Sequence, residues 1–147
     1  MFPMIVALVV VLGLALVVYA RQSRPAADAS DPSVGDHWHV AYGFNICGEW
    51  ISLQGDAEER DANGSFLNTD FARTGVHSHD DGVIHWHANS RAAVGRRAVF
   101  QVLLDVYDVE LENKKLVFPE EQRAQIAAVF GDKYEDGVFE SGETTCT

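Results

Sequence analysis

The sequence lacks the short motifs that mark the common catalytic and nucleotide-binding sites. HExxH, Gly-x-Ser-x-Gly and Walker loops are all missing from its 147 residues. Basic residues are few, with 11 Lys and Arg against 22 Asp and Glu, which gives a net charge of −11. Since a protein needs a positive surface to bind phosphates, nucleic acid is not an expected partner. The sequence therefore points to no particular enzymatic activity and to no catalytic residues.

Cysteine is also scarce. Cys47 and Cys146 are the only two, and they do not form a CxxC motif. Their spacing excludes a zinc ribbon and a thioredoxin-type dithiol. A pair this far apart predicts one long-range disulfide, Cys47–Cys146, in an oxidising compartment. The alternative for Cys47, a copper ligand beside histidine, ranks lower.

One long apolar run, from Phe2 to Ala20, lies at the N-terminus and carries no charge. A helix of this length extends for about 28 Å, close to the thickness of the hydrocarbon core of a bilayer. Because no Lys or Arg precedes the run, residues 1–21 fit an uncleaved transmembrane anchor better than a signal peptide. The positive-inside rule, applied to Arg21 and Arg24, would place the domain in the cytoplasm, whereas the cysteine pair and the histidines favour the outside. We expect a single-pass protein of the cell membrane with its domain outside.

The rest of the chain divides into a linker and one domain. Residues 22–35 are small, polar and Pro-containing, which is typical of a flexible linker. Residues 36–147 are expected to form one α+β domain with a small antiparallel sheet and two helices. One helix is predicted from Arg91 to about Val106, and the other begins at Pro119 and ends before a glycine.

Alternation of polar and apolar residues predicts the strands. From His37 to Ile46 one face is apolar and expected to be buried, and it carries Trp38, Val40, Tyr42, Phe44 and Ile46. Hairpins are predicted over residues 76–88, whose Trp86 is also expected in the core, and over residues 109–118. Residues 52–75 predict a long loop. Within or beside that loop, Glu49, Asp56 and the EERD run at 58–61 are interpreted as solvent-exposed surface.

All six histidines occur in His-x-His triplets: His37-Trp38-His39, His77-Ser78-His79 and His85-Trp86-His87. Residues i and i+2 of a strand project from the same face, so each triplet offers two neighbouring imidazoles. Neutral imidazole with nearby carboxylates suits Zn(II) or Cu(II), and the triplets therefore predict a transition-metal site. Six histidines exceed the needs of one tetrahedral ion, so either two ions bind or some histidines are structural.

The turn of the hairpin over residues 76–88 decides whether its two triplets share a face. A two-residue turn would place them on opposite faces of the sheet. A three-residue loop, Asp80–Gly82, pairs His77 with His85 and places both triplets on one face. We predict this second register because it separates polar from apolar side chains better. If the strand that begins at His37 neighbours the hairpin, all six imidazoles lie on one surface.

The nearest acids are Asp36, Asp80 and Asp81, which we expect as metal ligands or as acceptors for the imidazole N–H groups. Three other functions remain open. The histidines could be structural in a non-catalytic accessory subunit of a membrane complex, or they could sense pH. The protein could also be a metalloenzyme.

Two segments of the chain carry a family resemblance: HWHVAYGFNICGEW at 37–50 and GVHSHDDGVIHWHANSRAAVG at 75–95. They resemble a group of uncharacterised, membrane-anchored actinobacterial proteins with an HWH…C segment and a GxHxHxDGxIHxH segment. The resemblance covers about Asp36 to Leu111, and Gly142–Cys146 is similar to a later turn and cysteine of that group. It implies an exported, anchored domain and no particular activity.

Overall fold

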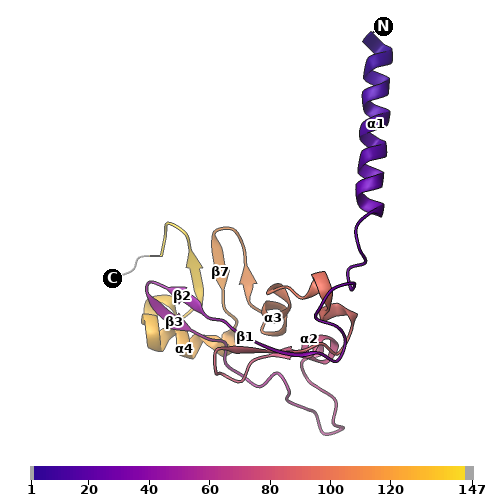
Figure 1. Ribbon diagram of the computed structural model, residues 1–147. Helices are drawn as coiled ribbons and strands as arrows, with labels where there is room; N and C mark the ends of the chain where they lie inside the picture. The colour runs from indigo at the N-terminus through magenta and orange to yellow at the C-terminus, as the bar shows by residue number, and fades with distance from the viewer. Residues whose placement is uncertain (1, 145–147) are drawn as a thin grey trace.

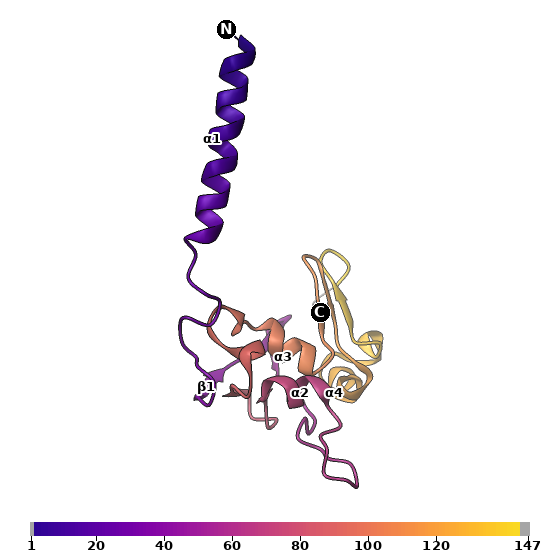
Figure 2. The same ribbon diagram turned by 90° about the vertical axis from the view of Figure 1, so that its right-hand side faces the viewer.

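The computed structural model describes residues 2–144, which form one long helix and an α+β domain (Figure 1). Helix α1 (Phe2–Gln22) stands apart from the domain in both views, and none of its residues is buried (Figures 1 and 2). It is long and apolar enough to cross a membrane. The predicted apolar N-terminal helix and the predicted α+β class are both confirmed.

The central sheet has three antiparallel strands in the order β1 (His37–Ala41), β5 (Val83–His87) and β4 (Val76–His77). The predicted register of the hairpin is confirmed, and the strand that begins at His37 is its neighbour. His77 lies opposite His85, as a three-residue loop requires, and His85 also lies opposite His39 of the neighbouring strand. Five of the six histidines therefore lie in one sheet, and His79 follows β4 by two residues.

The remaining elements surround this sheet. They are β2 (Phe44–Ile46), β3 (Glu49–Ile51), α2 (Thr69–Thr74), α3 (Gln101–Val106), β6 (Glu110–Leu111), β7 (Lys115–Val117), α4 (Glu120–Phe130) and β8 (Val138–Glu140), with 3₁₀ turns η1 (Arg91–Ala93), η2 (Gly95–Arg97) and η3 (Asp132–Tyr134). β2 pairs with β3, and β6, β7 and β8 form a third antiparallel sheet. The hairpin predicted over residues 109–118 and the helix predicted after Pro119 are confirmed.

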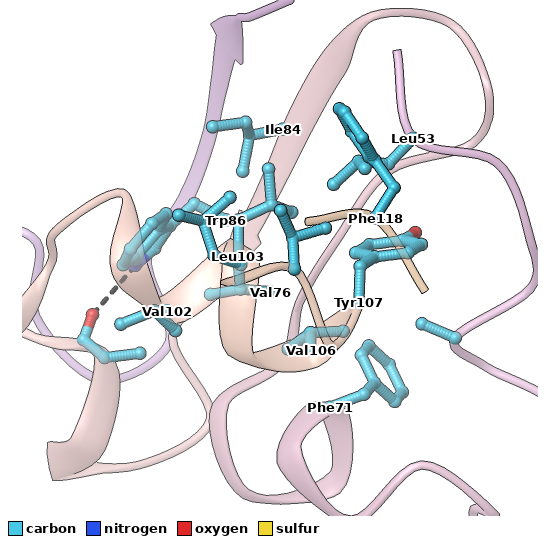
Figure 3. Packing of buried hydrophobic residues seen from close by; sticks show 14 of the residues in the cluster. Leu53, Phe71, Val76, Ile84, Trp86, Val102, Leu103, Val106, Tyr107 and Phe118 are labelled. Carbon is cyan, nitrogen blue, oxygen red and sulfur yellow. Dashed lines mark hydrogen bonds between the residues drawn. The ribbon is translucent and has the colours of Figure 1, made fainter. Parts of the chain in front are cut away.

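The hydrophobic core lies between the apolar face of the central sheet and α3 (Figure 3). Val76 and Trp86 of the sheet and Leu103 of α3 are all buried. The Trp86 indole N–H donates to the carbonyl of Ala93 at 2.8 Å, the dashed line in Figure 3. Burying each large apolar side chain contributes about 1.5–3 kcal/mol, so this packing holds the opposite, histidine-bearing face in place.

The prediction of one strand from His37 to Ile46 is wrong, because the chain leaves the sheet at Tyr42. The Tyr42 hydroxyl accepts a hydrogen bond from the N–H of Leu53 at 2.9 Å, and β2 then pairs with β3 instead. Trp38 and Val40, predicted to be buried, are each 47% exposed. Alternation shows which residues share a face, but it does not show whether another element covers that face.

The helix predicted from Arg91 to Val106 is correct only over its last turns, as α3. In the first half of this segment, backbone N–H groups do not form α-helical hydrogen bonds. Two of them donate instead to segments that are distant in the sequence. The N–H groups of Gly95 and Arg96 donate to the carbonyls of Pro32 and Ala27, at 2.9 and 2.8 Å. Tertiary hydrogen bonds therefore override the helical periodicity here.

Two further segments differ from expectation. The long loop predicted over residues 52–75 ends in helix α2, whose first turn is capped when Asn68 Oδ1 accepts from the N–H of Phe71 at 2.8 Å. The linker over residues 22–35 lies along the domain in its second half, where Pro32 is buried and the Gly35 N–H donates to the Ala88 carbonyl.

Candidate metal centre

The six histidines lie side by side on one face of the central sheet. Their ring centroids are 3.9 Å apart for His37 and His87, 4.6 Å for His39 and His85, and 5.3 Å for His77 and His85. Because β1 neighbours the hairpin, the condition for one shared surface is met. Within it the rings form two overlapping clusters that share His85.

The first cluster, which we call the inner site, consists of His77, His79 and His85. One nitrogen from each ring lies within 4.8 Å of the other two. The Nε2 atoms of His77 and His79 are 3.1 Å apart. Two imidazole nitrogens bound to the same tetrahedral zinc lie roughly 3.3 Å apart, given Zn–N bonds of about 2.0–2.1 Å. The inner site is therefore close to a chelating geometry.

His77 is the most firmly held histidine of the inner site. Its side chain is 2% exposed, and the ring of Phe71 packs against it edge-on at 5.1 Å. Nδ1 lies 3.3 Å from the carbonyl oxygen of Gly75, to which it can donate a proton. That hydrogen bond leaves the Nε2 lone pair free to bind a metal. Burial lowers the pKa of His77, which favours the neutral ring that a metal requires.

Glu58, which the sequence predicts to be exposed surface, reaches the inner site. Its Oε2 lies 3.7 Å from His77 Nε2 and 3.9 Å from His79 Nε2. The carboxylate is 45% exposed, so it faces the histidines from the solvent side. An oxygen donor here would complete a set of three nitrogens and one oxygen, which suits zinc. No pattern local to the EERD run signals this contact.

The loop that carries Glu58 is fastened at two points. The buried Gln122 side chain of α4 accepts from the Gln54 N–H at 2.9 Å and donates to the Gln54 carbonyl at 2.6 Å. Asp80 Oδ1 accepts from the N–H of Gly55 at 3.0 Å. Asp80 therefore contacts this loop in the structure, and through it helps to position Glu58.

Asp81 is the predicted acid that the structure brings to a histidine. Its Oδ2 lies 3.2 Å from His85 Nε2. A hydrogen bond from the Val83 N–H, and then the contact with His85, lowers the pKa of Asp81 to about 2. The carboxylate is therefore charged at neutral pH and can orient the His85 ring. Asp36, by contrast, accepts from the N–H of Ser33 at 2.7 Å.

The second cluster, the outer site, consists of His37, His39 and His85. The Nε2 atoms of His37 and His39 are 2.9 Å apart, and both residues are exposed on β1. His87 lies beside them, and its Nε2 is buried without a hydrogen-bond partner in the described part of the chain. Such a nitrogen is unfavourable in a dry protein and is readily satisfied by a metal ion or a water molecule.

The predicted Cys47–Cys146 disulfide stays a prediction, because Cys146 lies outside the described residues. A comparison of the chain with models of known protein families, with curated proteins and with solved structures finds no match. The resemblance to the actinobacterial group likewise stays an expectation.

Proposed function

We propose that this protein is a membrane-anchored domain that binds a transition metal, zinc or copper, on the histidine face of its central sheet. The observation that carries the proposal is the inner site. Three imidazole nitrogens lie within 4.8 Å of one another there, with the Glu58 carboxylate beside two of them. The apolar helix α1 supports the membrane anchor. The proposal places the domain on the outer side, which the cysteine pair and the histidines favour.

The exposure of the site favours a role in binding and exchanging the metal. His79 and Glu58 are 51% and 45% exposed, so a bound ion would keep one side toward solvent. The three histidines fill three positions of a tetrahedral ion, and the fourth falls to the half-exposed Glu58 carboxylate or to water, whereas structural zinc sites are closed by four protein ligands. Metal delivery or storage at the membrane surface therefore fits the geometry better than a purely structural ion.

The test is metal binding by the purified full-length protein in detergent. We expect zinc or copper(II) to bind at micromolar concentration with at least one equivalent retained. The variant His79→Ala should lose most of this binding, whereas Asn63→Ala, an exposed change in the same loop as Glu58, should retain it. Retention of less than about 0.2 equivalents by the unmodified protein, with no uptake at micromolar metal, would exclude the proposal.

A further inference from the structure

We infer that the domain docks onto the membrane surface through the face beside its linker, and that it binds anionic lipid headgroups there. This inference rests on the membrane anchor of the proposed function. We call this surface the linker face and define it by seven residues: Arg91, Arg96, Arg97, Trp38, Val40, Val99 and Phe100. Docking through the linker face would turn the histidine face away from the bilayer.

The linker holds this face close to the end of α1. The Arg96 guanidinium donates to the carbonyl of Pro25 at 2.8 Å, and Pro25 is only the third residue after Gln22, where α1 ends. Three residues extend for at most about 11 Å. The polar headgroup layer on each side of a bilayer is about 5–7 Å thick. If α1 spans the membrane, Arg96 therefore lies in or beside the headgroup layer.

The contacts that fix this arrangement are built into the backbone. Gly95 and Arg96 donate their N–H groups to the linker carbonyls of Pro32 and Ala27. Gly95 has φ +53, and a Cβ there would lie 2.2 Å from the carbonyl oxygen of Ala27. Only glycine permits so close an approach, so the linker rests on the domain at a defined place.

Charge separates the linker face from the rest of the protein. The linker with one residue on either side, residues 21–36, and the segment of the two 3₁₀ turns, residues 91–97, contain five arginines and three aspartates, a net charge of +2. The remaining residues contain six basic and 19 acidic groups, a net charge of −13. Arg91 pairs with Asp28 at 3.4 Å but stays 83% exposed, and Arg96 and Arg97 are also exposed. Anionic headgroups would attract this face and repel the others.

Apolar side chains complete the surface. Outside α1, nine large hydrophobic side chains are exposed in the described residues, and four of them lie together here: Trp38, Val40, Val99 and Phe100. With Pro32, Ile84, Trp86 and Ala98 they line one apolar hollow. Tryptophan beside arginine is typical of protein surfaces at a membrane interface.

The sheet geometry then orients the metal centre. Trp38 and Val40 alternate with His37 and His39 along β1, so the two pairs project from opposite faces. Figure 1 shows α1 rising on the side of β1 where α3 lies, and the loop between β3 and α2 on the other side. Docking by the linker face would therefore expose the histidine face to the aqueous phase, where metal is supplied.

The test uses the full-length protein in two kinds of vesicle, phosphatidylcholine alone and phosphatidylcholine with about one third phosphatidylglycerol. Brominated acyl chains quench the fluorescence of tryptophans that contact them. With phosphatidylglycerol we expect Trp50→Phe to retain the quenching and Trp38→Phe to lose most of it, although Trp50 is the more exposed residue. Circular dichroism verifies that both variants fold.

The arginines provide the second arm of the test. Arg91→Gln and Arg97→Gln should each lower the ratio of docked to undocked protein about fivefold in phosphatidylglycerol vesicles. The matched control, Arg123→Gln on exposed α4, should leave this ratio unchanged. Equal quenching in both kinds of vesicle, or equal losses in Trp38→Phe and Trp50→Phe, would overturn the inference.

Two further readouts separate this inference from the proposed function. Flotation of the protein with vesicles tests α1, and zinc uptake by the same vesicles tests the histidine face. Protein that floats and binds zinc without quenching of Trp38 would overturn docking alone. Burial of Trp38 that increases with the protein-to-lipid ratio would also overturn membrane docking, because a second copy of the chain would then cover the linker face.

Discussion

The inner and outer sites share His85 and one sheet face, yet the protein holds their ligands very differently. The inner site contains the buried His77, fixed by the Gly75 carbonyl, and lies beside the carboxylate of Glu58. The outer site adds two exposed histidines on strand β1. Among residues 2–144, no ion pair joins either of those two histidines to a carboxylate.

This difference shows how the surroundings of two histidine sites determine which of them binds a metal ion more tightly. A side chain that is already ordered loses less conformational entropy when it binds an ion. A neighbouring carboxylate also offsets the positive charge of the metal. We therefore expect the first ion to bind at the inner site. Because His85 serves both clusters, an ion bound there weakens binding at the outer site.

The largest effect is expected from His85→Ala, because it removes the ligand that both sites share. Loss of an outer-shell partner costs 10–100-fold in metal affinity, so loss of a ligand should cost about a hundredfold or more. His37→Ala, which touches only the outer site, should change the affinity for the first ion less than about threefold. Competition with a zinc-chelating dye measures both. Equal losses in the two variants would contradict the ranking of the sites.

Gly75→Ala should disrupt the inner site by displacing the backbone next to His77. Gly75 has φ +76, and a Cβ there would lie 2.0 Å from the carbonyl oxygen of His87. We expect a loss of about 2–4 kcal/mol in the free energy of unfolding, measured with urea, together with the loss of inner-site binding. The control is Gly64→Ala, since Gly64 also has positive φ but open space around it. Equal losses of stability would show that the close approach to His87 is unimportant.

The histidine face was predictable because its causes are local. A period of two places the histidines of a triplet on one side of a strand, and the residues of the Asp80–Gly82 turn indicate the register. The helix predicted from Arg91 failed for the opposite reason. Its N–H groups bond to the linker, more than 60 residues earlier in the chain, and no local pattern reports such a contact.

Glu58 shows the same limit at the candidate site. Its position depends on the hydrogen bonds between Gln54 and Gln122, which are 68 residues apart in sequence. Its own surroundings, two glutamates followed by an arginine and an aspartate, are typical of exposed surface. A carboxylate brought in by a loop can therefore be found only once the fold is known.

Glu58→Gln tests whether that carboxylate strengthens the inner site. The amide keeps the shape of the side chain and removes its negative charge, so we expect about a tenfold loss of zinc affinity at the inner site. Glu59→Gln is the matched control, because it removes the same charge from the adjacent exposed residue. The outer site should be unaffected by either change. Identical zinc affinities for the two variants would show that the loss comes from the change in net charge and not from the contact between Glu58 and the histidines.

The smallest effect is a pH dependence of the stability, which reports the burial of the His77 imidazole. Burial lowers the pKa of His77, and likewise that of His87, in the folded protein. As the pH falls below about 6.5, the unfolded chain takes up protons that the folded chain resists, so the metal-free protein should lose stability between about pH 7 and pH 5. Urea unfolding in the presence of a chelator measures this loss, and His77→Gln should reduce its slope. A stability that is constant over this range would mean that His77 is less buried in solution, and the advantage of the inner site would then rest on Glu58 alone.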